Sequence, residues 1–220
     1  LTRHREDIMT SFADRIVLIT GAGSGMGRSH AELFGARGAH VIVHDINADG
    51  AAATAQAIRD SGGKASAMIA DIRDLTAFRK ALADAVKAAG EVDILVNNAG
   101  VGGRRLLIED IYENDWDDFM AVHVRGAFFA TQAVLPAMKA KRYGRIINIS
   151  SQWGIAGAPT ASQYAGAKAA LIGYTKAWAK ELASFGITVN SVAPGYIMTP
   201  MTAHSKRSPE VFAERLKPIP

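Results

Sequence analysis

The sequence predicts an α/β protein built on a doubly wound parallel sheet, with helices on both faces of the sheet. Short β-branched segments alternate with longer segments rich in Ala, Leu and Lys that have helical spacing. The short segments are apolar throughout, which is typical of strands buried on both faces of a parallel sheet. In such a sheet, ligands bind beyond the carboxyl ends of the strands.

The predicted elements follow one another regularly along the chain. Strands are expected at 15–20 (RIVLIT), 40–45 (HVIVHD), 65–71 (ASAMIAD), 92–98 (VDILVNN), 144–150 (GRIINIS) and 187–193 (ITVNSVA). Helices are expected at 26–37, 48–61, 74–89, 115–140 and 162–185. No repeat or linker interrupts the alternation, so we expect one domain over residues 1–220, with an N-terminal extension at 1–12 and a substrate-loop region at 196–220.

Composition excludes several classes of protein. The chain of 220 residues is 49% hydrophobic and 21% charged, which fits a globular protein and not a disordered one. It has no cysteine, so disulfides and thiolate metal sites are excluded, and no metal site is expected. There is no signal-peptide core at the N-terminus and no apolar run of about 18 residues. We therefore expect a cytoplasmic protein without a membrane partner.

The charge is basic, with a formal net charge of +4 and a pI of about 9.4. The basic residues are scattered, and the small cluster KAKR at 139–142 suits the C-terminal end of a helix. We therefore expect no nucleic-acid partner, and we assign the positive field to the attraction of anionic ligands.

A glycine-rich turn follows the first predicted strand and opens a helix, in TGAGSGMGRSHAEL at 20–33. Glycine permits a tight turn and lets the backbone approach a pyrophosphate, which the free N–H groups of the helix then bind. The pattern predicts a dinucleotide site in this strand–turn–helix context. The turn residues expected at the cofactor are Gly21, Ser24, Gly25, Met26 and Gly27.

Asp45 ends the second predicted strand and points to NAD as the cofactor. A carboxylate there accepts hydrogen bonds from the adenosine ribose and repels a 2′-phosphate. The alternative is that it merely caps the next helix. Neither Ser24 nor Ile46, which flank this region, is basic, and only His44 and Arg28 are placed to welcome a phosphate. NAD is therefore favoured over NADP.

Six motifs in order resemble the short-chain dehydrogenase/reductase family over essentially the whole chain. They are TGAGSGMG (20–27), DI (71–72), NNAG (97–100), NISS (148–151), YAGAK (164–168) and APGYIMT (193–199). The resemblance, which includes 3-oxoacyl-carrier-protein reductase-like and secondary-alcohol dehydrogenase members, implies a Rossmann-type fold. It also implies further cofactor contacts from Asp71, Ile72, Asn98, Ala99, Gly100, Pro194, Gly195, Ile197 and Thr199.

Tyr164 and Lys168 lie about one helical turn apart on one face of a predicted helix. By themselves they fit a surface pair equally well. A free tyrosine has a pKa near 10, and a neighbouring ammonium, a helix N-terminus near Ser162 and an oxidised nicotinamide all favour the phenolate. We therefore expect the phenol pKa to be lowered into the working range of a base.

The resemblance completes the site with Ser151, just beyond the fifth predicted strand. It implies that Ser151 binds the substrate oxygen while Tyr164 takes the alcohol proton and a hydride passes to NAD. The resemblance also implies that Lys168 lowers the tyrosine pKa and holds the nicotinamide ribose, and that both Tyr164 and Lys168 contact the cofactor. The reverse reaction reduces a ketone.

His123 stands where family members usually have asparagine, a residue that helps hold a water between the active-site lysine and solvent. One interpretation is that the ring fills space beside Gly126 and is satisfied by a backbone carbonyl. The other is that a ring nitrogen accepts from the relay water. Because histidine titrates near pH 6.5, the second interpretation predicts an acidic limb in the pH–rate profile.

Several alternatives stay open at the level of the sequence. The chain stops at LKPIP, where the family continues through a last strand and helix, so we expect these to be lacking. Besides an NAD-dependent secondary-alcohol dehydrogenase, the chain fits a catalytically silent NAD-binding regulator or scaffold, an NADPH-dependent 3-oxoacyl thioester reductase or, less well, a nucleotide-sugar epimerase or dehydratase.

The small-molecule alcohol or ketone is not identified by the sequence. Its walls are expected from 101–111, 152–163 and the segment after Gly195. Trp153 either packs on an apolar or aromatic substrate or is an exposed loop residue, and Arg104 and Arg105 are either anion receptors or a solvated loop pair. A homo-oligomer, dimer or tetramer, is expected because the helices at 115–140 and 162–185 carry apolar residues on more than one face: Phe119, Phe128, Phe129, Val134, Trp178 and Leu182.

Overall fold

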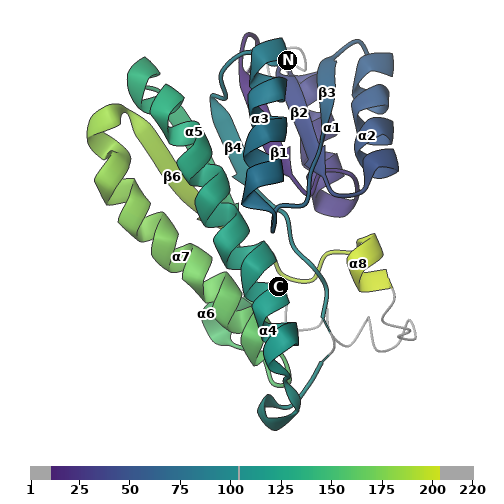
Figure 1. Cartoon of the computed structure of the whole chain (residues 1–220), viewed down its shortest axis with the longest axis vertical. Helices are drawn as coiled ribbons and strands as arrows, with labels where there is room; N and C mark the ends of the chain where they lie inside the picture. Colours follow the sequence, from purple (N-terminus) through teal and green to yellow (C-terminus); the bar gives the residue numbers. More distant parts are fainter. Residues whose placement is uncertain (1–10, 104, 204–220) are drawn as a thin grey trace, which may run out of the picture.

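The computed structural model describes residues 11–103 and 105–203. In this part of the chain, six strands form one parallel sheet in the order β3–β2–β1–β4–β5–β6 (Figure 1). The chain order reverses between β1 and β4, where a doubly wound sheet opens a crevice for ligands. The predicted fold class is confirmed. The strands are β1 (Ile16–Thr20), β2 (His40–Asp45), β3 (Lys64–Ile69), β4 (Ile94–Asn97), β5 (Gly144–Ile149) and β6 (Ile187–Val192).

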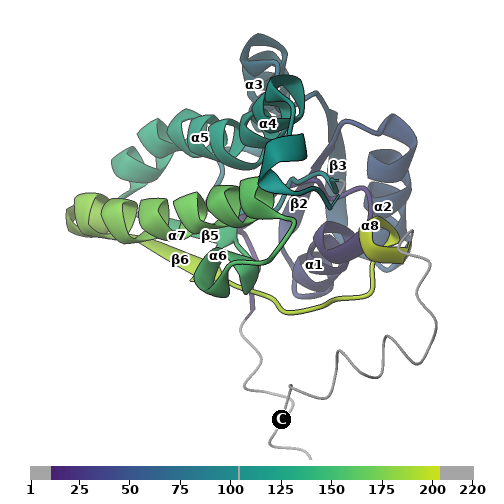
Figure 2. The same ribbon diagram turned by 90° about the horizontal axis from the view of Figure 1, so that it is seen from below.

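Helices cover both faces of the sheet, as Figure 2 shows. The helices α1 (Gly25–Ala36) and α2 (Ala48–Asp60) pack on one face, where their small residues meet strand residues such as Val17 and Val41. The helices α3 (Leu75–Ala89), α5 (Ala127–Lys141) and α7 (Ser162–Leu182) pack on the other face, against residues such as Leu18 and Ile42. Because successive strand residues point to opposite faces, both must be apolar, which explains the continuous apolar strands.

The long helix predicted at 115–140 is interrupted. The structure has α4 (Glu113–Met120), a π-helical segment η2 (Ala121–Gly126) and then α5. Such π-helical turns are frequent at functional sites, and this one carries the buried His123. Three short helical segments were not predicted: η1 (Ile108–Asp110), α6 (Trp153–Ala156) and α8 (Pro200–Ala203). The helix predicted at 162–185 ends in a 3-10 turn, η3 (Ala183–Phe185).

The first helix begins differently from the next two. Asn47 caps α2 by accepting from the backbone N–H of Gly50 at 2.8 Å, and Asp74 caps α3 in the same way. The residue before α1 is Ser24, which makes no side-chain cap. The first-turn N–H groups of α1 are therefore without a side-chain cap, and the cap of α2 is Asn47, not Asp45.

The apolar residues behind the oligomer expectation divide into two groups. Phe119, Val134 and Leu182 are buried inside the chain and so cannot contribute to an interface. Phe128, Phe129 and Trp178 are only partly buried, and Phe128 and Trp178 pack with Tyr174 in an aromatic cluster between α5 and α7. The domain boundaries at 1–12 and 196–220, and the expected lack of a last strand and helix, reach outside the described residues and stay predictions.

No helix in residues 11–103 or 105–203 is long and apolar enough to cross a membrane.

Candidate active site

The glycine turn after β1 requires glycine for steric reasons. Gly21 and Gly25 have φ angles of +66° and +55°, the left-handed region that side chains with a Cβ rarely adopt. A Cβ on Gly27 would collide with the carbonyl oxygen of Gly21. Glycine therefore allows α1 to start directly against the end of β1.

The segment after β4 is fastened to the same turn. The Oγ1 atom of Thr20 accepts from the backbone N–H groups of Asn98 and Ala99, each at 3.0 Å. The side-chain amide of Asn98 donates to the carbonyl oxygens of Thr20 and Gly21 at 2.9 and 3.0 Å. Asn98 thus holds the two sides of the crevice together, and Thr20 is a positioning residue that the sequence reasoning missed.

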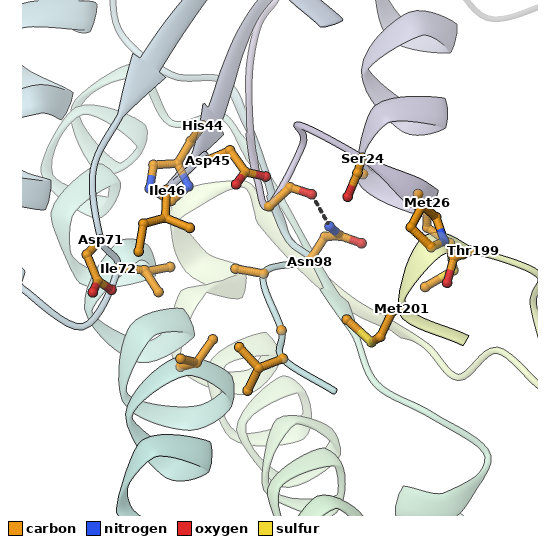
Figure 3. Close-up of a pocket in the computed structure, with 18 of the residues that line it drawn as sticks. Ser24, Met26, His44, Asp45, Ile46, Asp71, Ile72, Asn98, Thr199 and Met201 are labelled. Carbon is orange, nitrogen blue, oxygen red and sulfur yellow. Dashed lines mark hydrogen bonds between the residues drawn. The ribbon is translucent and has the colours of Figure 1, made fainter. Parts of the chain in front are cut away.

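A cavity of about 310 Å³ lies at the carboxyl ends of β1, β2 and β4 (Figure 3). The predicted cofactor residues that line it are Gly21, Ser24, Gly25, Met26, Gly27, Asp45, Ile46, Asp71, Ile72, Asn98, Ala99, Gly100 and Thr199. Five other predicted cofactor residues do not line this cavity: Tyr164, Lys168, Pro194, Gly195 and Ile197. Lining residues that were not predicted at the cofactor are His44, Ala70, Arg73, Val101, Val122, Pro200 and Met201.

Asp45 has two hydrogen bonds in addition to its place in the cavity wall. One carboxylate oxygen accepts from the backbone N–H of Gly23 at 2.8 Å, and the other accepts from that of Asn47 at 2.9 Å. The carboxylate therefore ties the glycine turn to the end of β2. Each oxygen has a further lone pair, so these bonds leave acceptor capacity toward the cavity.

The two residues considered as phosphate receptors do not supply a cation to the cavity. Burial lowers the pKa of His44 to about 4 despite the opposing charge of Asp45, so the ring is neutral at pH 7. Its Nε2 atom lies 3.1 Å from the carbonyl oxygen of Ala70. Arg28 is outside the cavity lining and pairs with Glu32 at 2.7 Å.

Arg73 is a cation in the cavity wall that sequence reasoning missed. It pairs with Asp71 at 2.8 Å and with Asp118 at 3.1 Å. The hydrogen bond from Arg73 lowers the pKa of the Asp71 carboxyl. Its position two residues after Asp71 was the available signal. Both carboxylates draw on its charge, so it is not an isolated positive group.

Tyr164 and Lys168 point inward from α7, and the surface-pair interpretation is wrong for the lysine. The Lys168 side chain is buried, with 4% of the residue exposed, and its ammonium donates to the carbonyl oxygen of Ile149 at 2.8 Å. The hydroxyl of Ser150 donates to the carbonyl oxygen of Lys168 at 2.7 Å. These two bonds join the end of β5, which carries Ser151, to α7.

Ser151 meets the phenol of Tyr164. Its Oγ atom accepts from the backbone N–H of Trp153 at 3.2 Å, and a side-chain hydrogen bond links it to Tyr164. The backbone bond orients the serine hydroxyl, because an acceptor contact on one side leaves the O–H free to donate elsewhere. The structure thus brings the three predicted catalytic residues together.

The protonation of this group differs from the sequence expectation. Burial raises the pKa of Tyr164, and the hydrogen bond to Ser151 opposes that rise. Burial also lowers the pKa of Lys168 to about 8. Removal from water disfavours the charged form of both groups. Burial, which the expectation left out, therefore opposes the lowering of the phenol pKa in the free chain, and the part assigned to an oxidised nicotinamide stays a prediction.

His123 packs between the cofactor segment and the phenol. A Cβ on Gly100 would lie 2.6 Å from the His123 ring, so the ring fills space beside Gly100, whereas the neighbour of Gly126 is Ile72. The Nε2 atom lies 3.0 Å from the carbonyl oxygen and 3.2 Å from the backbone nitrogen of Val101. The space-filling interpretation therefore names the wrong glycine but the right kind of backbone contact.

Burial and the charge of Lys168 lower the pKa of His123 to about 3. The ring is therefore neutral from about pH 5 to 8, and the predicted acidic limb is not expected there. Its Nδ1 atom is buried and has no hydrogen-bond partner among the described residues. A role in a water relay is not tested by this geometry and stays a hypothesis.

The segment from Pro194 to Thr199 connects the catalytic residues with the cavity. The carbonyl oxygen of Pro194 accepts from the backbone N–H of Gln152 at 3.0 Å, next to Ser151. Farther along, a Cβ on Gly25 would lie 3.3 Å from Thr199. Pro194 and Gly195 therefore lie at the catalytic loop, and Thr199 closes over the glycine turn.

Comparison with known proteins agrees with this geometry. Residues 15–210 match the family of short chain dehydrogenases. The chain is 42% identical over 188 residues to a 3-oxoacyl-[acyl-carrier-protein] reductase of Thermotoga maritima, covering 86% of this chain and 76% of that protein.

Two solved structures are similar over nearly the whole chain. A 3-oxoacyl-[acyl-carrier protein] reductase from Brucella melitensis with bound NAD has a TM-score of 0.85 and 35% identity, covering 94% of this chain and 77% of that one. A candidate NAD(P)-dependent gluconate 5-dehydrogenase from Beutenbergia cavernae, with NADP at low occupancy, has a TM-score of 0.89 and 37% identity, covering 96% and 83%. The chain belongs to the short-chain dehydrogenase family, the NAD(P)-binding oxidoreductases that act on CH–OH and carbonyl groups.

Proposed function

We propose that this protein transfers a hydride between NAD and a secondary alcohol or ketone. The observation that carries the proposal is the meeting of Ser151, Tyr164 and the buried Lys168 beside a crevice suited to a dinucleotide. The uncapped first turn of α1 and the close glycine turn fit a pyrophosphate. The Asp45 carboxylate, which lines the same cavity, fits the hydroxyls of a ribose.

Each of the three catalytic residues has its own role in the reaction. A bound nicotinamide supplies the hydride acceptor. Ser151, oriented by the Trp153 N–H, holds the substrate oxygen through its hydroxyl. Tyr164 takes the proton from that oxygen during oxidation and returns it during reduction. Lys168 keeps a cation behind the phenol, and the positive charge of an oxidised nicotinamide adds to it, which offsets the rise in phenol pKa that burial causes.

The preference for NAD over NADP rests on charge. Asp45 lines the cavity as a carboxylate that would repel a 2′-phosphate, while His44 is neutral and Arg28 is paired with Glu32. An NADPH-dependent 3-oxoacyl thioester reductase is the second candidate. It is favoured by the 42% identity to the Thermotoga maritima reductase.

We further propose that the protein works in the cytoplasm as a dimer or tetramer, on a small molecule, with no nucleic-acid or membrane partner. The partly buried aromatic cluster on α5 and α7 supports self-association, because apolar rings left at the surface are covered by an interface in many proteins.

The deciding experiment follows nicotinamide absorbance with NAD or NADP over a panel of secondary alcohols and 3-hydroxyacyl thioesters. Turnover of a secondary alcohol with NAD, lost in Tyr164→Phe, is the expected result. Turnover of thioesters with NADP as the preferred cofactor would replace the proposal with the second candidate. Tight cofactor binding with no turnover of any substrate would instead favour the silent regulator.

A further inference from the structure

Three aromatic rings stand nearly perpendicular to the ring of Tyr164. The ring centres of Phe119, His123 and Trp153 lie 6.3, 5.5 and 5.8 Å from that of Tyr164, with interplanar angles of 80° to 84°. Phe119 and His123 are 6% and 2% exposed, whereas Trp153 is only partly buried. Of these three rings, Trp153 is therefore the one that a substrate beside the phenol can touch.

Arg105 holds this tryptophan. Its guanidinium carbon lies 4.8 Å from the centre of a Trp153 ring, within the range of a cation–π contact. The Nε atom of Arg105 donates to the hydroxyl of Thr160 at 2.8 Å, and Nη2 donates to the carbonyl oxygen of Pro159. A planar guanidinium can stack and donate in two directions at once, which a lysine ammonium cannot do.

The contact also joins the loop that carries Arg105 and Leu106 to the loop that carries Pro159 and Thr160. The backbone N–H of Leu106 donates to the carbonyl oxygen of Thr160 at 2.9 Å, so Thr160 is held through both its hydroxyl and its carbonyl. Thr160 has a φ of +62°, which is unfavourable for a β-branched residue. Such a conformation persists where its surroundings impose it, and Arg105 and Leu106 are those surroundings.

Trp153, which Arg105 holds, contacts both Ser151 and Tyr164. The Trp153 side chain packs against Tyr164, while its backbone N–H donates to Oγ of Ser151. A movement of Trp153 therefore changes both the wall beside the phenol and the support of the serine. Arg105, although exposed, is engaged by Trp153, Thr160 and Pro159, whereas Arg104, the other member of the predicted pair, lies outside the described residues.

We infer that Arg105 is a positioning residue that sets substrate specificity by holding Trp153 as an apolar wall beside Tyr164. The wall selects secondary alcohols and ketones that carry an aryl group next to the reacting carbon. This inference rests on the proposed function. An edge-to-face aromatic contact contributes about 0.5–1.5 kcal/mol, so the expected preference is about two- to tenfold.

The test compares kcat/KM for oxidation of 1-phenylethanol and 2-butanol. Wild-type enzyme is expected to favour 1-phenylethanol, and Trp153→Ala, Arg105→Met and Arg105→Lys should each reduce that ratio about two- to tenfold, chiefly through KM. Arg59→Met, which removes an exposed arginine on α2, serves as the control for lost charge and should leave the ratio unchanged.

The two arginine variants separate positioning from charge. If Arg105→Lys kept the wild-type ratio while Arg105→Met lost it, the charge itself would be the cause and the inference would be overturned. An unchanged ratio in both variants would overturn it as well. Oxidation of neither alcohol by the wild type contradicts the aryl class.

A fluorescence measurement decides the positioning role without turnover. Because the Arg105 guanidinium stacks on Trp153, Arg105→Met should shift the tryptophan emission of the wild type and leave that of Trp153→Phe unchanged. If Arg105→Met caused no emission shift in the protein that retains Trp153, the proposed hold of Arg105 on Trp153 would be refuted. Failure of the proposed function gives a different result. The wild type would then turn over no substrate of the wider panel, while Arg105→Met would still shift the tryptophan emission.

Discussion

The Lys168 ammonium lies 5.7 Å from the centre of the Tyr164 ring. Its hydrogen bond goes to the carbonyl oxygen of Ile149, which anchors the side chain at the end of β5. Both groups are removed from water, so the pKa of the tyrosine rises and that of the lysine falls. Burial therefore disfavours the charged form of both groups in the free protein.

Replacing Tyr164 with phenylalanine should remove turnover and spare cofactor binding, because only the proton-transfer hydroxyl is lost. The expected loss in kcat is about 10²- to 10⁴-fold. Tyr174→Phe is the matched control, since Tyr174 lies on the same helix but packs with Phe128 and Trp178. A Tyr164→Phe enzyme with more than about a tenth of wild-type activity would contradict the acid–base role.

The buried Lys168 predicts a specific dependence of stability on pH. Its folded-state pKa of about 8 lies below the ordinary value of 10.5. Below about pH 8 both states carry the proton, and the folded state bears the cost of the buried charge in full. Between about pH 8 and 10.5 the unfolded state binds more protons, so the free energy of unfolding rises with pH, by at most about 3 kcal/mol.

Lys168→Met removes this rise. Urea unfolding of the cofactor-free protein should show the variant gaining most over the wild type near pH 7 and losing that advantage toward pH 10.5. Lys176→Met, on an exposed part of the same helix, is the control. Parallel pH dependences for Lys168→Met and the wild type would mean that Lys168 titrates normally.

Asp45→Asn should narrow the preference for NAD over NADP in kcat/KM, because the side chain keeps its shape and loses its charge. The single side-chain nitrogen of asparagine donates and does not accept, so one of the hydrogen bonds from Gly23 and Asn47 is also lost. Asp49→Asn, an exposed carboxylate in the first turn of α2, controls for net charge. A wild-type enzyme that prefers NADP would refute the assignment.

His123→Asn should give a pH–rate profile that superimposes on that of the wild type between about pH 5 and 8. The reason is that burial and Lys168 lower the pKa of the histidine to about 3, so neither side chain titrates in that range. An acidic limb present in the wild type and absent from the variant would show that His123 does become protonated during turnover.

The protein should be at least a dimer at micromolar concentration, as measured by light scattering. Phe128, Tyr174 and Trp178 form the aromatic cluster that an interface would cover. Trp178→Lys should weaken association by placing a charge on that surface. Phe119 is buried inside the chain and is not part of this test. A monomeric wild type would contradict the prediction.

The sequence by itself determined the fold class and most of the nucleotide crevice. Continuous apolar strands alternating with helices admit few arrangements other than a parallel sheet covered on both faces. The glycines at 21, 25 and 27 and the carboxylate at 45 are local signals, because a tight turn and the end of a strand depend on neighbouring residues. These residues line the cavity as expected.

Tertiary structure alone decided the electrostatics and the substrate wall. Burial of Tyr164, Lys168 and His123 depends on what packs over them, so the sequence could not supply the effect of burial on their pKa values. His123 of η2 contacts Val101 and Arg105 donates to Thr160, and both contacts join residues far apart in the chain. The hydrophobic periodicity of the sequence does not predict such contacts, because they form only when segments distant in the sequence meet in the folded chain.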